Sequence, residues 1–142
     1  MSGFLLDTNI ISELVKPRPE PNVTDWIEGT DESLLYLSVL TLGEIRRGIA
    51  TLQASRRRAT LEAWLDKDLR ARFEGRILMI DEEVADRWGL LTAAARKSGI
   101  GLPVIDGLLA ATALDHNLTL VTRDTGQFAS LGVALFNPWE GI

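Results

Sequence analysis

The sequence predicts an α/β fold, a three-layer α/β/α sandwich around a mainly parallel sheet of about five strands. The first observation is that short apolar runs alternate along the chain with segments of helical periodicity. The second is that residues 4–6 form an apolar run followed at once by helix-spaced apolar residues, as in a buried strand that leads into a helix. The third is a length of 142 residues with 46% hydrophobic content, enough for one core. We therefore expect a single domain over residues 1–142.

The first half of the chain is expected to hold two strands and four helices. Thr8 or Asn9 can cap the first helix, and three prolines in residues 17–21 end it, because proline cannot continue a helix. Apolar residues recur at helical spacing in the next two helices, and good helix formers fill the fourth. The expected strands lie at residues 4–6 and 34–38, and the expected helices at 8–15, 22–28, 41–52 and 54–73.

The second half continues the alternation. A helix with one apolar face is expected to end at Gly99, and Pro103 opens a further helix that is dense in Ala and Leu and so expected to be buried. The expected strands lie at residues 76–80, 118–122 and 133–136, and the expected helices at 81–98 and 103–116. Strands that alternate with helices in this way favour a parallel sheet covered on both faces.

Composition excludes several classes of site. The chain has no cysteine, which rules out disulfides and thiolate metal sites, and its one histidine argues against a histidine zinc site. No apolar run approaches the length of a membrane span and no signal peptide is recognisable, so we expect a cytoplasmic protein. A net charge of -5 argues against a general nucleic-acid coat protein but not against a nuclease, because clustered carboxylates add to the acidic count.

Four carboxylates are placed to meet at one edge of such a sheet. Asp7 and Asp124 follow expected strands, Glu44 lies on the helix after a strand, and Asp106 lies in the first turn of a helix. In open α/β sheets the functional crevice lies beyond the carboxyl ends of the strands. Four carboxylates together would repel one another unless a cation neutralised them, and all-oxygen ligands select Mg²⁺ or Mn²⁺. Such ions suit phosphodiester cleavage.

Each acid also has a simpler interpretation. Asp7 can be a helix cap, Glu44 can form an exposed ion pair with Arg47, Asp106 is favourable at the positive end of a helix, and Asp124 can belong to a turn with Gly126. These interpretations account for the acids singly and not for their joint placement.

Four segments in order resemble the PIN-domain ribonucleases, and more closely the VapC-type toxins of bacterial toxin–antitoxin pairs, in particular their FitB-like branch. The segments are Leu5-Leu6-Asp7-Thr8-Asn9, Gly43-Glu44-Ile45-Arg46-Arg47-Gly48, Pro103-Val104-Ile105-Asp106 and Thr122-Arg123-Asp124. The ending Phe136-Asn137-Pro138-Trp139 is similar to that branch as well. The resemblance covers essentially the whole chain.

This resemblance implies an acidic pocket that binds Mg²⁺ or Mn²⁺, in which Asp7, Glu44 and Asp106 match the three core acids. Asp124 matches the position of the fourth. Many VapC-like chains have Asn there and an acid three residues later, where this chain has the neutral Gln127, so we choose Asp124.

The expected function is metal-dependent hydrolysis of RNA by the toxin of a type II toxin–antitoxin pair. Asp7 and Asp106 would bind the metal directly, and Glu44 and Asp124 would complete its surroundings or orient the attacking water. Small polar groups at strand ends are expected to hold the carboxylates or a water at the metal, and arginines are expected to contact the RNA backbone. The polar groups are Thr8, Asn9, Ser38 and Thr122, and the arginines are Arg46, Arg47 and Arg123.

The resemblance further implies a homodimer and a small VapB-like antitoxin, joined in a heterotetramer or larger assembly. A HAD-like phosphotransferase is disfavoured because Asn9 stands where that chemistry needs an Asp, and a dinucleotide-binding fold because no G-x-G-x-x-G follows the first strand. The alternative that stays open is a non-catalytic, antitoxin-binding subunit of a DNA-bound repressor complex.

Overall fold

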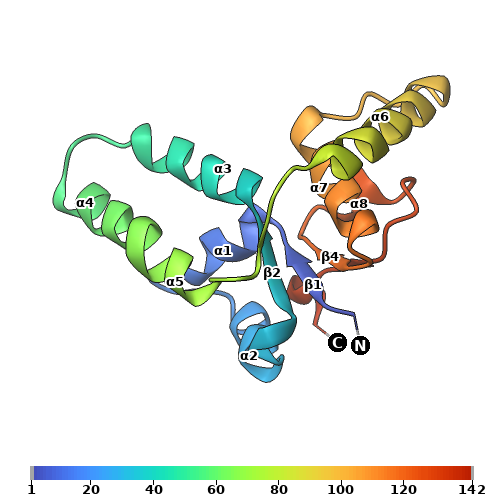
Figure 1. The fold of residues 1–142 in the computed structure, drawn as a ribbon. Coiled ribbons are helices and arrows are strands. Elements are labelled where there is room, and N and C mark those ends of the chain that lie inside the picture. The colour runs from blue at the N-terminus through green and yellow to red at the C-terminus, as the bar shows by residue number, and fades with distance from the viewer. Residues whose placement is uncertain (1, 142) are drawn as a thin grey trace.

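A five-stranded parallel sheet forms the centre of the structure, a computed structural model that describes residues 2–141. The strand order is β3-β2-β1-β4-β5, and every neighbouring pair is parallel (Figure 1). The strands are β1 (Phe4–Leu6), β2 (Leu35–Ser38), β3 (Ile77–Leu78), β4 (Thr119–Val121) and β5 (Leu135–Phe136). Because β1 lies in the middle of this order, the residues that follow β1, β2 and β4 meet at one edge.

Helices connect the strands and cover both faces of the sheet. They are α1 (Thr8–Leu14), α2 (Pro21–Gly29), α3 (Val39–Ala50), α4 (Arg56–Ala63), α5 (Arg70–Arg72), α6 (Glu82–Lys97), α7 (Val104–Asp115) and α8 (Thr125–Phe128). Short 3-10 turns lie at Glu32–Leu34 and Pro138–Glu140, and a π-helical turn lies at Trp64–Leu69. Across residues 2–141 no helix combines the length and the apolar character needed to cross a membrane.

The alternation of side chains along β1 explains the layers. Leu5 and Leu6 are both fully buried but point to opposite faces, since successive residues of a strand do so. Leu6 belongs to a core cluster with Ile10 of α1 and Ile45 of α3, whereas Leu5 belongs to a second cluster with Leu109 of α7. Figure 1 shows α3, α4 and α5 on one side of the sheet and α6, α7 and α8 on the other. The predicted three-layer α/β/α sandwich is thus confirmed.

Three local features differ from the sequence prediction. The helix expected over residues 54–73 is α4, the π-helical turn and α5 in succession, and Trp64 and Arg70 keep right-handed helical dihedrals at the joins. The strand expected over residues 76–80 pairs with β2 only at Ile77–Leu78, and Met79 is 66% exposed. The short helix α8 was not predicted, because Gly126 in its middle is a poor helix former.

Gly107 lets α6 and α7 pack closely. A Cβ atom at this position would lie 2.9 Å from Cδ1 of Trp88, closer than carbon atoms approach. The residue is buried in the second turn of α7, directly after Asp106. The missing side chain therefore helps to fix where α7 begins, and with it the position of the Asp106 carboxylate.

Candidate functional site

Asp7 and Thr122 join the carboxyl ends of β1 and β4. The Asp7 backbone N–H donates to the carbonyl of Val121 at 2.9 Å, which continues the parallel ladder by one residue. The hydroxyl of Thr122 then donates to Oδ2 of Asp7 at 2.8 Å. Thr122 is fully buried and Asp7 is 8% exposed. One carboxylate oxygen of Asp7 is therefore held by the neighbouring strand.

The other oxygen of Asp7 caps α1. Oδ1 accepts a hydrogen bond from the backbone N–H of Thr8 at 2.7 Å, so the capping role considered for this residue is present alongside its placement at the sheet edge. Burial raises the pKa of Asp7, and the negative charges of Glu44 and Asp106 raise it further, while the hydrogen bonds from Thr122 and Thr8 oppose the rise. Asp7 is thus a buried acid whose pKa is affected by two other carboxylates.

Glu44 reaches the same edge from α3. The hydroxyl of Thr8 donates to Oε1 of Glu44 at 2.5 Å and lies 3.5 Å from the hydroxyl of Thr41, which is fully buried one turn earlier on α3. The ion pair considered for Glu44 is also present, with Nη2 of Arg47 4.0 Å from Oε2. This pair is long and its arginine is 76% exposed, so solvent screens it. The shorter contact to Thr8 is the one that orients the carboxylate.

Asp106 lies in the first turn of α7. Its pKa is raised by burial first, and then by the negative charges of Glu44 and Asp124. The favourable position of an acid at a helix start also applies to Asp106. Its electrostatic coupling to Glu44 and Asp124 places it with acids from α3 and from the loop after β4. The charges of Glu44 and Asp106 also act on Asp7, so the four predicted acids influence one another at this edge of the sheet. Within residues 2–141, however, the group of three acids whose carboxylate oxygens lie within 4.8 Å of one another is a different one, Asp81, Glu83 and Asp115.

Asn9 holds the loop that carries Asp124. Its amide nitrogen lies 3.3 Å from Oδ2 of Asp124 and 3.4 Å from the hydroxyl of Thr122, and its amide oxygen accepts from the backbone N–H of Arg123 at 3.4 Å. The Asp124 N–H also donates to the Thr122 hydroxyl oxygen at 3.0 Å. Instead of the turn with Gly126 considered for Asp124, the structure has helix α8, which begins at Thr125 and which the Asp124 side chain does not cap. Asp124 is tied through Thr122 to Asp7.

The remaining predicted polar group, Ser38, has a structural contact. It is fully buried at the end of β2, and its hydroxyl oxygen accepts from the backbone N–H of Leu40, which caps α3. Its hydrogen bonds within residues 2–141 do not reach the four acids. Ser38 therefore contributes by fixing the start of the helix that carries Glu44.

The three predicted arginines differ in their surroundings. Arg46 pairs with Asp66 in the π-helical turn, and Arg47 lies near Glu44. The guanidinium carbon of Arg123 lies over the ring of Trp139, 5.2 Å from its centroid. Arg123 is exposed at the loop between Thr122 and Asp124.

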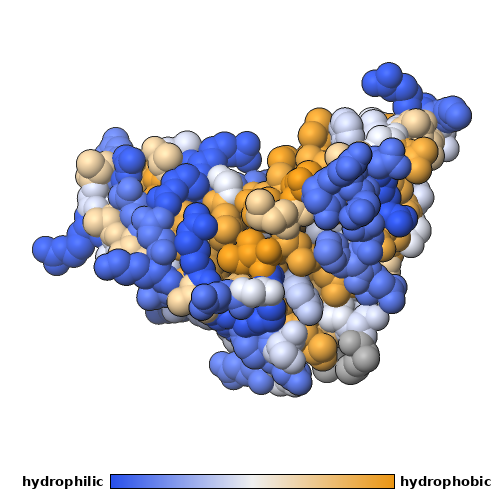
Figure 2. Space-filling model, viewed as in Figure 1, coloured by the Kyte–Doolittle hydropathy of each residue, from blue (hydrophilic) through white to orange (hydrophobic). Residues whose placement is uncertain are grey.

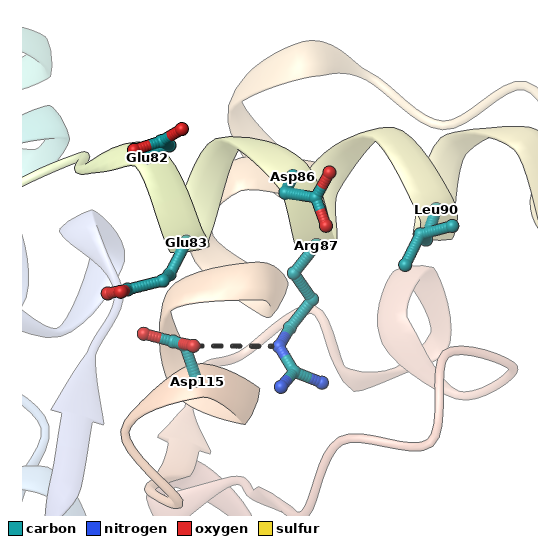
Figure 3. A pocket seen from close by; sticks show the side chains of 6 residues that line it. All are labelled: Glu82, Glu83, Asp86, Arg87, Leu90 and Asp115. Atoms are coloured by element: carbon teal, nitrogen blue, oxygen red, sulfur yellow. Dashed lines mark ion pairs between the residues drawn. The ribbon is translucent and has the colours of Figure 1, made fainter.

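A second group of acids, which the sequence did not single out, lies elsewhere on the surface. Carboxylate oxygens of Asp81, Glu83 and Asp115 lie within 4.8 Å of one another. Glu83 and Asp115 of this group line a cavity of about 470 Å³ between α6 and the end of α7, where Nε of Arg87 is 3.9 Å from Oδ1 of Asp115 (Figure 3). Asp115 lies nine residues after Asp106 on α7, about 13 Å along the axis.

The helix ends explain most of this second group. Asp81 caps α6 through its hydrogen bond to the Val84 N–H at 2.9 Å, and Glu83 lies in the first turn, where acids are favourable. Asp81 and Glu83 are exposed, and Asp115 already has Arg87 beside it. The signal for this cluster in the sequence was the run of acids at the start of α6, in which Asp81 is the cap.

The family model described as "PIN domain" matches residues 4–133, which include all four predicted acids. The chain belongs to the PIN-domain family.

Two relatives of this PIN-domain chain carry the names toxin and ribonuclease. It is 41% identical over 137 residues to Toxin FitB of Neisseria gonorrhoeae (strain ATCC 700825 / FA 1090), covering 96% of this chain and 99% of that protein. It is 38% identical over 137 residues to VapC ribonuclease Y4jK of Sinorhizobium fredii (strain NBRC 101917 / NGR234), covering 96% and 98%. A solved structure of FitAB bound to an IR36 DNA fragment superposes with a TM-score of 0.91 at 39% identity, covering 96% of this chain and 95% of that chain.

Sequence reasoning missed two residues that contact the predicted PIN-domain site. Thr41 lies beside the Thr8 hydroxyl that binds Glu44. The sequence signal for it is weak: Thr41 is a polar residue three positions before Glu44 on the same helix. Trp139 lies under Arg123, and its segment was noted only as part of the resemblance. Neither contact can be found from spacing alone, because each joins parts of the chain that meet only in the folded sheet.

Proposed function

We propose that this PIN-domain protein is an endoribonuclease that uses Mg²⁺ or Mn²⁺ and acts as the toxin of a type II toxin–antitoxin pair. The observation that carries the proposal is the convergence of Asp7, Glu44, Asp106 and Asp124 at the carboxyl edge of the sheet, where burial first, and then nearby negative charge, raise the pKa of Asp7 and Asp106. Burial and mutual repulsion destabilise the ionised carboxylates, and a bound cation would offset the repulsion.

The donor set fits a hard divalent cation. All four side chains offer oxygen, and the chain has no cysteine for a thiolate ligand. Asp7 and Asp106 would hold the ion directly, with Glu44 and Asp124 completing its surroundings. When bound, the ion would supply Lewis-acid polarisation of an RNA phosphate and activation of water. The second acidic group near Asp115 is not assigned this role, because exposed acids at a helix start need no cation.

The neighbouring hydroxyl and amide groups would fix the acids for this role. Thr122 donates to Asp7, Thr8 donates to Glu44, and Asn9 donates to Asp124. Carboxylates held by such hydrogen bonds lose less rotational freedom when they bind an ion. Ser38 would act less directly, by capping the helix of Glu44.

The RNA backbone would be bound by arginines at the rim. Arg123 and Arg47 lie next to site acids in sequence and space, whereas Arg46 already has Asp66 as a partner. The net charge of -5 makes a local cation necessary to attract RNA. We therefore rank Arg123 first for this contact, and Arg46 last.

A small VapB-like antitoxin would bind in the groove that runs from the acids along α3. The name Toxin FitB and the FitAB structure support this partner. The complex would form in the cytoplasm. A cavity of about 200 Å³ begins at Thr8 and Glu44 and continues to Leu61 and Trp64, so that a segment in it would cover an acid. Its lining is completed by Ser12, Val15, Ile45, Gly48, Ile49 and Leu52.

A homodimer would cover apolar surface near the site. Figure 2 shows apolar residues gathered between the lobe of α3 and α4 and the lobe of α6 and α7. Met79 is 66% exposed and Val104 is 58% exposed, and a contiguous exposed apolar patch is typical of an interaction surface. A heterotetramer or larger assembly would follow if each copy of a dimer also bound one antitoxin.

The test compares induction of the wild-type chain with Asp7→Asn and Asp106→Asn, followed by growth and by mapping of RNA ends. A nuclease predicts growth arrest with discrete new RNA ends, both abolished by either substitution, while both variants still bind the antitoxin. Growth arrest that survives both substitutions would contradict the nuclease and favour the alternative, a binding subunit of a DNA-bound repressor complex. Antitoxin binding by both variants is the control that they fold.

A further inference from the structure

The C-terminal segment 136–139 contacts the loop that carries Asp124. The guanidinium of Arg123 stacks over Trp139 at 5.2 Å, and the side-chain amide of Asn137 donates to the backbone carbonyl of Arg123 at 3.4 Å. The segment therefore holds both the side chain and the backbone of Arg123.

Trp139 is a fixed platform. Its backbone N–H donates to Oδ1 of Asn137 at 2.9 Å, and its carbonyl accepts from the side chain of Asn22 at 3.2 Å. Its ring packs against the core cluster that contains Leu6. An arginine that stacks on such a ring has lost much of its freedom before any ligand arrives.

The donors of Arg123 are free for a ligand. Within the described range 2–141, its guanidinium takes part in no hydrogen bond and no ion pair, and the residue is exposed. Its charge acts on Glu13, whose pKa it lowers as the last of several causes. Stacking uses one face of the planar group and leaves its N–H edge available, which is the edge that binds a phosphate. By contrast, Arg46 is paired with Asp66.

The position of Arg123 suits a phosphate that approaches the acids. Its backbone N–H donates to Asn9 Oδ1, and it stands between Thr122, which binds Asp7, and Asp124. An RNA strand entering this acidic edge needs positive charge beside it. Arg123 supplies that charge without neutralising a site carboxylate.

We propose that Trp139 is a positioning residue that holds the Arg123 guanidinium for contact with an RNA phosphate next to the acidic site. The inference rests on the proposed ribonuclease function. It predicts that Trp139 acts on RNA binding only through Arg123.

The experiment measures binding of a labelled single-stranded oligoribonucleotide of mixed sequence to the full chain over a range of salt concentrations. All proteins carry Asp7→Asn to prevent cleavage. Arg123→Gln is expected to weaken binding about tenfold and to make the slope of log affinity against log salt shallower by about 0.7. Trp139→Leu is expected to weaken binding about two- to fivefold, and Trp139→Phe less than that.

The decisive comparison repeats Trp139→Leu in the Arg123→Gln background. If Trp139 acts through Arg123, it causes no further loss there, whereas a merely structural role would weaken binding equally in both backgrounds and overturn the inference. Arg96→Gln removes the same charge from the exposed end of α6 and is expected to leave the affinity unchanged. Arg123→Lys serves if Trp139→Leu does not fold: it keeps the charge, loses the stack, and is expected to keep the salt slope with a weaker affinity.

The two proposals fail in different ways. RNA binding that is unaffected by Arg123→Gln would overturn the role of Arg123 and Trp139 and leave the ribonuclease proposal standing. Absence of RNA binding by the Asp7→Asn chain, together with absence of RNA cleavage by the wild-type chain, would overturn both.

Discussion

The hydroxyl of Thr122 donates a 2.8 Å hydrogen bond to Oδ2 of Asp7, between residues 115 positions apart in sequence. The hydroxyl oxygen of Thr122 in turn accepts from the N–H of Asp124, so one buried hydroxyl links the acids that follow β1 and β4. The two residues meet in space only because β1 and β4 are neighbours in the sheet. The site thus depends on the register of β1 against β4.

Removal of this hydroxyl is expected to impair both stability and cation binding. Thr122→Val keeps the shape of the side chain but leaves Oδ2 of buried Asp7 and the Asp124 N–H without their partner. The expected cost is about 1–3 kcal/mol of unfolding free energy, with weaker Mn²⁺ binding by titration calorimetry and about tenfold slower RNA cleavage. Thr122→Ser retains the hydroxyl and is the matched control. Equal behaviour of the Val and Ser variants would contradict the role of the hydrogen bond.

Without added cation, the protein is expected to lose stability as the pH rises. The folded state raises the pKa of Asp7 by burial and by nearby negative charge, and raises that of Asp106 for the same reasons. Folded protein then binds these protons more tightly than unfolded protein does. The stabilisation that the two protonated acids contribute is therefore present below the ordinary pKa of 3.8 and is lost as the pH rises through the raised values. Melting temperatures in a chelator across this range test the sign.

Mn²⁺ is expected to reverse this trend. A cation binds the ionised acids, so the shift in melting temperature caused by Mn²⁺ should grow as the pH rises. Asp7→Asn removes one of the repelling charges, and should raise the melting temperature in chelator at neutral pH while reducing the shift with Mn²⁺. A melting temperature lowered by Asp7→Asn in chelator would show that the hydrogen bonds of Asp7 outweigh the repulsion.

The fold was predictable from the sequence because its signals are local. Apolar runs and helical periodicity are read within a few residues, and the opposite faces of Leu5 and Leu6 follow from the two-residue repeat of a strand. The π-helical turn at Trp64–Leu69 was not predictable in this way, because α- and π-helical turns use the same residue types.

The candidate site was predictable in its acids and not in their contacts. Asp7 and Asp124 could be placed from strand ends, whereas the contact of Asn9 with Asp124 depends on the register of β1 and β4. Likewise, the sequence gives no partner for Arg46, which pairs with Asp66 only because α3 packs beside the π-helical turn.

Glu13 is expected to stabilise the proline-rich segment after α1. It is 5% exposed; its Oε1 binds Lys16 at 2.8 Å, and its Oε2 accepts from the backbone N–H of Glu20 at 3.0 Å. Glu13→Ala would leave both donors unpaired and is expected to cost about 1–3 kcal/mol of unfolding free energy in denaturant titrations. Lys16→Ala keeps the bond to Glu20 and should cost less. Equal losses from the two variants would assign the whole effect to the ion pair.

The same contacts give Glu13 a pH dependence of opposite sign to that of Asp7. The hydrogen bond from Lys16 is the largest cause that lowers the pKa of Glu13, and the Glu20 N–H also lowers it. The stabilisation is therefore present above the ordinary pKa of 4.5 and is lost as the pH falls through the lowered value. The difference in unfolding free energy between wild type and Glu13→Gln should shrink over that acidic range.

The packing of α6 on α7 gives a matched pair of glycine substitutions. Gly→Ala in an exposed helix interior stabilises the folded state by about 1 kcal/mol. A Cβ atom at Gly89 of α6 would have no neighbour within 4 Å, so Gly89→Ala should raise the melting temperature. At Gly107 the new methyl would lie 2.9 Å from the Trp88 ring, so Gly107→Ala should lower it and shift the start of α7 with Asp106. Calorimetry measures both, and Mn²⁺ affinity should fall in Gly107→Ala alone. An unchanged Mn²⁺ affinity in that variant would show that α7 yields at Trp88 without moving Asp106.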